Sequence, residues 1–180
     1  MNGWMMRAGA VDTRIHQLLL RTRRPYLTRA MFTVTRLGDP PSLLLVGVLL
    51  LLAPLPLPVG VAAHGALGGL ATFVVSQVLK RVISRPRPEL PVGLKRLIHP
   101  PDQFSFPSGH AAVSLAMALP LALALPMGWG VALVTIASVV GISRAYLGVH
   151  YPGDVVAGWL LALAASHLVG GILGVGGIPG

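Results

Sequence analysis

The feature that most limits the possible folds is an almost continuously apolar stretch over residues 43–79. As a single helix with a rise of about 1.5 Å per residue it would extend about 55 Å, nearly the thickness of two bilayer cores. Pro54, Pro56 and Pro58 lie near its middle, where an α-helix cannot continue normally. We therefore expect two membrane spans joined at these prolines; one long kinked helix is the alternative.

Three further apolar segments have the length of membrane helices, at residues 111–126, 129–146 and 155–172. The chain of 180 residues is 54% hydrophobic and only 11% charged, and its mean hydropathy is +0.76, far from the values of soluble proteins. We predict an all-α fold, a polytopic transmembrane helical bundle of about five spans in the cell (inner) membrane. The absence of cysteine excludes disulfides and thiolate metal sites.

The N-terminal part of the chain is amphipathic rather than continuously apolar. Val11, Ile15 and Leu18 recur at helical spacing, with arginines elsewhere around the helix. Pro25 should end this run, and a second apolar stripe follows it. We expect two short helices lying on the membrane surface; an ordinary solvated basic tail is the alternative. The predicted organisation is an amphipathic interfacial arm, 1–41, followed by a transmembrane domain, 42–180.

The charge of the chain is strongly basic, with 14 Lys+Arg against 5 Asp+Glu and a net charge of +9. The basic residues flank apolar segments, and 6% aromatic content offers few stacking platforms for bases, so nucleic acid is not the expected partner. The expected partners are anionic lipid headgroups. With five spans, all of these cations fall on one face of the membrane, and the positive-inside rule assigns that face to the cytoplasm. The sequence contains no indication of the oligomeric state.

A short polar stretch between two apolar runs, residues 143–154, contains Arg144, His150 and Asp154. A neutral imidazole can attack phosphorus if its lone pair faces the substrate while the other ring nitrogen keeps its proton. A carboxylate that accepts this N–H fixes the tautomer and stabilises the cation formed on attack. An arginine can neutralise the phosphoryl oxygens. The alternative is that His150 and Asp154 only cap the helix that starts near Pro152.

Two more stretches accompany this one, residues 80–88 and 107–110. Together the three read K-x6-R-P, P-S-G-H and S-R-x5-H-x3-D, in this order. This combination resembles the type 2 phosphatidic acid phosphatase family, whose signature is shared with bacterial acid phosphatases and vanadium haloperoxidases. The resemblance covers residues 80–154, somewhat under half of the chain. Membrane members of the family commonly have six spans, and here the amphipathic arm replaces the first.

The resemblance implies a role for each motif residue. It makes His150 the nucleophile, His110 the general acid and Asp154 the orienting carboxylate. The implied phosphate ligands are Lys80, Arg87, Ser108, Gly109 and Arg144. The spacing from the lysine selects Arg87 over Arg85, which we expect to contact headgroups or solvent. Glycine and the free amides at the start of the helix entered at residue 111 suit an anion. Taken singly, Lys80 could only snorkel, Ser108 could only be an N-cap and Arg144 could only anchor the interface.

The function implied by the resemblance is a lipid phosphate or diphosphate phosphatase that forms a phosphohistidine on His150. A phosphate monoester carries about −1.5 to −2 charge, which three fixed cations and helix amides can balance. Only Glu89, Asp102 and Asp154 lie near the motifs, too few for a Mg²⁺ site, so we expect no metal and no cofactor. Candidate substrates are glycerolipid phosphates, isoprenyl diphosphates and polyprenyl-linked phosphosugars.

Alternative functions remain open at the level of sequence. The same site could pass the phosphoryl group to an alcohol, as a lipid phosphotransferase, or the chain could be a membrane scaffold or transporter with a degenerate site. Haloperoxidase chemistry belongs to soluble scaffolds, which the hydropathy argues against. Relatives that act on undecaprenyl diphosphate generally face outward, which conflicts with the cytoplasmic assignment made from charge.

Overall fold

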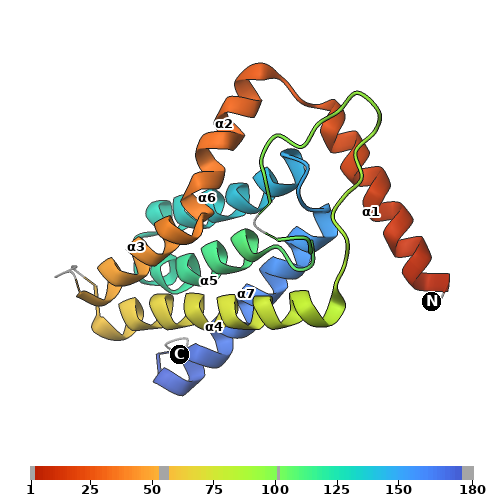
Figure 1. Ribbon diagram of the computed structural model, residues 1–180. Helices are drawn as coiled ribbons and strands as arrows, with labels where there is room; N and C mark the ends of the chain where they lie inside the picture. Colours follow the sequence, from red (N-terminus) through yellow and green to blue (C-terminus); the bar gives the residue numbers. More distant parts are fainter. Residues whose placement is uncertain (1–2, 53–56, 101, 176–180) are drawn as a thin grey trace.

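The computed structural model describes residues 3–52, 57–100 and 102–175 and is all-helical, as the hydropathy predicts (Figure 1). No named strand occurs in these ranges, and the only bridge there pairs Pro86 with Phe104. The helices are α1 (Gly3–Arg21), α2 (Pro25–Thr35), the short 3-10 helix η1 (Arg36–Gly38), α3 (Pro40–Leu52), α4 (Val59–Ile83), α5 (Gly109–Ala124), α6 (Met127–Tyr146) and α7 (Pro152–Leu173).

The membrane part consists of the five helices α3 to α7, one for each predicted span. By length and hydropathy α4, α6 and α7 can each cross a membrane, and α2 with η1 and α3 can do so as one span bent by 49°. The count of five is therefore approximate, because α3 has 13 residues and extends only about 20 Å. α3 and α4 are separate helices that pack on each other. Of the predicted proline turn, Pro54 and Pro56 lie outside the described residues, and Pro58 is the N-cap of α4.

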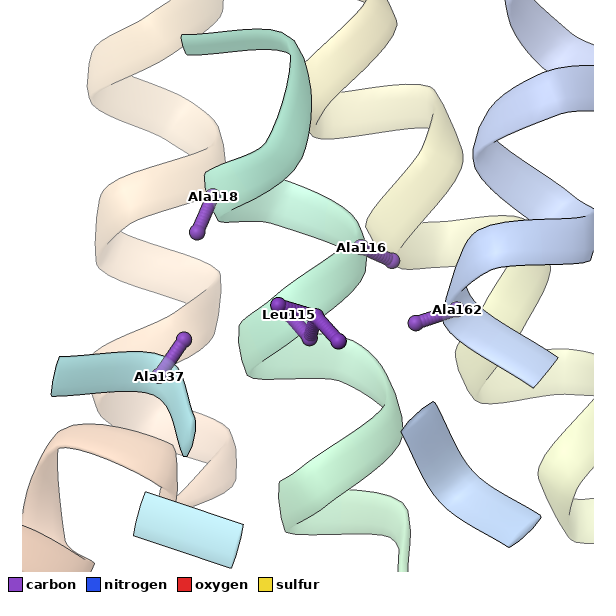
Figure 2. Packing of buried hydrophobic residues seen from close by; sticks show 5 residues of the cluster. All are labelled: Leu115, Ala116, Ala118, Ala137 and Ala162. Carbon is purple, nitrogen blue, oxygen red and sulfur yellow. The ribbon is translucent and has the colours of Figure 1, made fainter. Parts of the chain in front are cut away.

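The centre of the bundle is α5, which contacts α4, α6 and α7. Figure 2 shows that α5 packs on its neighbours through small side chains: Ala118 lies near Ala137 of α6, and Ala116 faces Ala162 of α7. Alanine at these positions lets the helix backbones approach closely, which is how helices pack where water supplies little driving force. Most of the large exposed apolar side chains lie on the outer faces of these helices, as expected for surfaces that contact lipid.

The N-terminal arm contains the two predicted helices, and α2 begins at Pro25 as expected. α1 is amphipathic: Val11 is 56% and Leu18 is 59% exposed, whereas His16 and Leu20 are buried. Nε2 of His16 lies 3.1 Å from the carbonyl oxygen of Ala145, at the end of α6. The arm is therefore packed on the bundle instead of being a solvated tail. Its position on a membrane surface, and the domain boundary after residue 41, stay predictions.

One end of the bundle gathers the three sequence motifs. The C-terminal ends of α4 and α6 lie there, together with the N-terminal ends of α5 and α7. The loop from α4 to α5 arches over this end and passes beside α1 (Figure 1), where Arg85 contacts Asp12. Alternating helix direction is what brings residues distant in sequence to this common end.

Candidate active site

A cavity of about 470 Å³ opens at this end of the bundle. Its polar end is lined by Lys80, Asp102, Gly109, His110, Arg144 and His150. The remainder is an apolar groove between α3 and α4, floored by α5, with Leu44, Val48, Leu67, Leu70 and Phe73 among its lining residues. Most of the predicted site residues therefore share one cavity, while Ser108, Arg87 and Asp154 stand behind its surface.

His150 lies in the connection between α6 and α7 and is almost fully buried. Its Nδ1 is 2.6 Å from the carbonyl oxygen of Ser105, which can only accept, so Nδ1 carries the proton. Nε2 then holds the lone pair, and a guanidinium N–H of Arg87 approaches it to 3.4 Å. Burial lowers the pKa of His150 to about 4, and the charges of Arg87 and Arg144 act in the same direction. The imidazole is thus neutral at physiological pH.

Asp154 lies in the first turn of α7 and is fully buried, with 0% of its side chain exposed. Its Oδ2 is 3.7 Å from Nδ1 of His150 and accepts a hydrogen bond of 2.8 Å from the backbone N–H of Tyr151. The direct acceptor of the His150 proton is therefore the Ser105 carbonyl, and Asp154 supplies negative charge beside it. The capping alternative also holds in part, because the same bond to Tyr151 caps α7.

Arg85 does not point to headgroups or bulk solvent, and that expectation is wrong. Its guanidinium donates to Oδ1 of Asp154 at 2.6 Å and to Oδ2 of Asp12 at 2.7 Å, and it stacks 4.1 Å from the ring centre of Tyr151. Burial works against its charge, but the carboxylates of Asp154 and Asp12 raise the pKa of this guanidinium. Spacing from Lys80 could not show this, because Asp12 and Asp154 are 142 positions apart in the chain and meet only in the fold.

Lys80 and Arg87 share one carboxylate, that of Asp102. Nζ of Lys80 lies 2.6 Å from Oδ2, and Nη2 of Arg87 lies 2.7 Å from Oδ1. Burial alone would raise the pKa of Asp102, but the hydrogen bonds and charges of the two cations lower it below its ordinary value. Lys80 and Asp102 line the polar end of the cavity, whereas Arg87 stands behind them.

Arg144, at the end of α6, is almost fully buried and only partly satisfied. Nη1 donates to Oγ1 of Thr35 at 2.8 Å, but the buried Nε has no hydrogen-bond partner among the described residues. A buried unpaired donor of a charged group is costly, and the Arg144 side chain that carries it lines the cavity. The arrangement suits an anion such as a phosphoryl group, and it is unlike that of a simple interfacial anchor.

The P-S-G-H stretch begins α5. Ser108 is its N-cap and accepts a weak hydrogen bond of 3.5 Å from the N–H of Ala111, so in this structure the serine caps the helix and does not line the cavity. Gly109 and His110 do line it. Nε2 of His110 lies 2.9 Å from Oδ1 of Asp39, in the turn between η1 and α3.

Sequence reasoning assigned no role to several residues that contact the motif side chains. They are Asp12, Thr35, Asp39, Asp102 and Ser105. One signal existed: carboxylates are rare in this chain, with 5 Asp+Glu in total, and a rare charge in an apolar chain tends to have a partner. No comparable signal marks Ser105, which acts through its backbone carbonyl.

Comparison with known proteins identifies the family of this chain. The pattern of the PAP2 superfamily matches residues 61–172. Phosphatidylglycerophosphatase B of Bacillus subtilis is 34% identical over 182 residues, which cover 90% of this chain and 83% of the relative. An undecaprenyl-diphosphatase of Sulfolobus acidocaldarius is 37% identical over 97 residues, 53% of this chain and 47% of the relative. A decaprenylphosphoryl-5-phosphoribose phosphatase of Mycobacterium tuberculosis is 37% identical over 110 residues, which cover 59% of this chain and 58% of the relative. The chain thus spans about half the length of these last two relatives.

Two solved structures are similar in fold. The crystal structure of a transmembrane PAP2 type phosphatidylglycerolphosphate phosphatase from Bacillus subtilis superposes with a TM-score of 0.70 at 30% identity, covering 92% of this chain and 86% of the other. Aquifex aeolicus LpxE superposes with a TM-score of 0.75, covering 87% and 92%; at 24% identity it supports the fold alone. Since the family pattern covers more than half of the chain and the B. subtilis phosphatase matches most of both lengths, this membrane protein belongs to the PAP2 superfamily.

Proposed function

We propose that the chain is a metal-independent phosphatase of membrane lipid phosphates or diphosphates that works through a phosphohistidine on His150. One observation carries the proposal: a single cavity combines cations and two histidines at one end with an apolar groove at the other. A phosphate headgroup fits the first part and an acyl or isoprenoid chain the second. The curated relatives named above as phosphatases of lipid-linked substrates support this interpretation.

In the first step, Nε2 of His150 attacks the phosphorus atom. The N–P bond forms while the bond from phosphorus to the leaving oxygen breaks, and protonated His110 gives its proton to that oxygen. The guanidinium of Arg144, which lines the cavity, binds the phosphoryl oxygens, and Lys80 and Arg87 supply further positive charge. The cation that forms on His150 is stabilised by the Ser105 carbonyl and by the charge of Asp154.

In the second step, water takes the place of the leaving group, which is an alcohol from a phosphomonoester and a lipid monophosphate from a diphosphate. The now neutral His110 takes a proton from this water as its oxygen attacks phosphorus, the N–P bond breaks, and inorganic phosphate leaves. Both histidines return to their starting states. The order of proton transfers is balanced because the proton lost by His110 in the first step is regained in the second.

The donor set supports chemistry without a bound metal ion. Within the described residues, no three His, Asp or Glu side chains are placed to share a metal. The carboxylates next to the cavity are already engaged: Asp102 by Lys80 and Arg87, and Asp39 by His110. The fixed cations would neutralise the charge of the phosphate, which is the role of the metal ion in metal-dependent phosphatases.

The decisive assay is release of phosphate by the purified protein from a panel of lipid phosphates and diphosphates, with EDTA present. Wild type should be active, His150→Ala should lose at least about 10³-fold in kcat, and vanadate should inhibit. Activity that is abolished by EDTA and restored by Mg²⁺ would overturn the metal-free mechanism. Full activity of His150→Ala would overturn the phosphohistidine. Comparing phosphate released with lipid product formed separates hydrolysis from transfer to an alcohol, and no turnover at all would leave the scaffold or transporter hypothesis.

The same proposal includes an orientation and a substrate class. All 14 Lys+Arg lie in the arm, in the ends of α4 and α6, or in the loop between α4 and α5, so the active-site face is the cytoplasmic one by the positive-inside rule. On that face, glycerolipid phosphates and polyprenyl-linked phosphosugars are favoured over recycling of undecaprenyl diphosphate outside. The lipid would enter laterally between α3 and α4.

A further inference from the structure

We propose that Asp39 is a positioning residue for the proton donor His110, supplied by the N-terminal arm and outside the residues that the family pattern matches. The inference rests on the proposed function, since it concerns the protonation of a leaving group. Asp39 stands 71 positions before His110, in a turn for which the three motifs give no prediction. It would make His110 part of a second carboxylate–histidine pair beside that of Asp154 and His150.

The contact itself is close and directional. Nε2 of His110 lies 2.9 Å from Oδ1 of Asp39. An ionised carboxylate can only accept, so Nε2 carries a proton in this arrangement. The His110 side chain is 12% exposed, whereas that of Asp39 is 44% exposed. The aspartate therefore reaches from the rim of the cavity to a histidine that is mostly enclosed.

The turn that presents Asp39 is shaped to fit His110. Gly38, the last residue of η1, is buried. A Cβ atom on Gly38 would lie 2.9 Å from Cδ2 of His110 and 2.5 Å from Cγ1 of Val140, closer than real Cβ atoms approach. Only a residue without a side chain lets the backbone lie this close to the imidazole. The position of Asp39 next to His110 is therefore fixed by the close packing of Gly38 as well as by one hydrogen bond.

The other side of the turn is also fixed to the site. Thr35, the last residue of α2, accepts the hydrogen bond of Arg144 at 2.8 Å. A second, smaller cavity of about 300 Å³ lies under the turn and is bordered by both His110 and Arg144. The segment 35–39 thus contacts the proton donor and a phosphate-binding cation at the same time.

The charges around His110 give Asp39 a specific task. Arg144 of α6 lines the same cavities as the imidazole and carries a positive charge, which disfavours a second one on His110. Asp39 is the carboxylate in contact with this imidazole. A carboxylate in hydrogen-bond contact stabilises the imidazolium that a general acid needs. With Nε2 held by Asp39, the other ring nitrogen is left to give its proton to the leaving oxygen.

The test compares substrates that differ in their need for a proton. A lipid phosphate expels an alkoxide and needs general acid catalysis, whereas an aryl phosphate expels a phenolate that leaves with little help. For Asp39→Asn we expect kcat with the lipid phosphate to fall at least about 10-fold and kcat with p-nitrophenyl phosphate to fall less than about 3-fold. His110→Ala should show the same selective pattern. Asp39→Glu, which keeps the charge, should recover part of the loss.

The matched control is Glu89→Gln, which removes one negative charge from an exposed position in the loop between α4 and α5. It should leave both substrates within about 2-fold of wild type. Equal losses of Asp39→Asn on both substrates, or no loss on either, would overturn the inference while leaving the phosphatase proposal intact. An inactive wild type, or an active His150→Ala, would instead overturn the phosphatase proposal. Gly38→Ala gives an independent check, since a displaced turn should reproduce the selective loss.

Discussion

The tautomer of His150 is fixed by a backbone carbonyl more than by a carboxylate. The Ser105 oxygen takes its Nδ1 proton at 2.6 Å, whereas the nearest oxygen of Asp154 stands 3.7 Å away. The loop holds Ser105 in place through its own bonds: its N–H donates to the carbonyl of Arg85 at 2.8 Å and its hydroxyl to that of Pro86 at 2.9 Å. A side-chain substitution cannot remove this acceptor, so the tautomer depends on the path of the loop.

The lowered pKa of His150 leads to a prediction about pH. Because burial lowers this pKa to about 4, the protonated, non-nucleophilic form appears only as the pH falls towards 4, instead of near 6.5 as for a free histidine. ¹⁵N NMR spectra of the protein in detergent micelles should show a neutral Nδ1–H tautomer for His150 at pH 6, with its resonances assigned by their loss in His150→Ala. Titration of this ring near 6.5, or an Nε2–H tautomer, would contradict the assignment.

At the level of single residues, the family resemblance grouped several side chains that line one cavity, but it did not predict the residues that hold them in place. Lys80, His110, Arg144 and His150 line one cavity, as the spacing of the three motifs implied. Their partners Thr35 and Asp39 come from a segment of the arm that lies outside the three sequence motifs. Such contacts depend on how the arm folds back over the bundle, and hydrophobic periodicity carries no information about that.

At the scale of elements, Arg85 connects α1 to α7. Oδ2 of Asp12 in α1 and Oδ1 of Asp154 in α7 bind the same guanidinium, and Oδ1 of Asp12 also accepts the N–H of Gly153 at 2.8 Å. The loop residue therefore fastens the amphipathic helix to the first turn of the helix that follows His150.

This connection predicts the effect of removing Arg85. Arg85→Gln leaves the buried Asp154 without its salt bridge of 2.6 Å, and loss of one member of a buried ion pair costs about 3 kcal/mol or more. We expect a lower thermal unfolding midpoint and at least about 10-fold lower kcat. The control Arg81→Gln, at an exposed position at the end of α4, should change neither. If Arg85→Gln matches this control in both measurements, the network has no part in orienting the site.

Local sequence signals predicted where helices begin better than they predicted how the helices pack on one another. α2, α3 and α7 each begin at a proline, namely Pro25, Pro40 and Pro152, where the fixed φ and missing N–H of proline are tolerated. The docking of α1 could not be deduced in the same way. Its buried face carries His16, a residue that belongs to none of the three motifs and that bonds a backbone carbonyl of α6.

At the scale of the whole molecule, charge is distributed unevenly from end to end. The cations lie in the arm, the loop between α4 and α5 and the neighbouring helix ends, while the sequence of the turn between α5 and α6, at the opposite end, contains none. This asymmetry was predictable from the sequence once the spans were counted, since alternating helices determine which segments share a face. It is the basis of the proposed cytoplasmic orientation.

The orientation can be measured because the chain has no cysteine of its own. Glu89→Cys places a single thiol on the active-site face, and Gly128→Cys places one at the opposite end; both positions are exposed. A membrane-impermeant maleimide added to intact cells should label Gly128→Cys and leave Glu89→Cys unlabelled until the membrane is opened. The reverse pattern would put the active site outside the cell.

The reach of the arm matters for anyone who shortens this protein. The matched family segment starts at residue 61, and a fragment trimmed to it would retain every signature side chain. It would nevertheless lack the partners that Arg144, His110 and Arg85 find in residues 12–39. If such a fragment failed to turn over substrate, the cause would be the loss of these supporting contacts. The result would not count against the chemistry proposed for the intact chain.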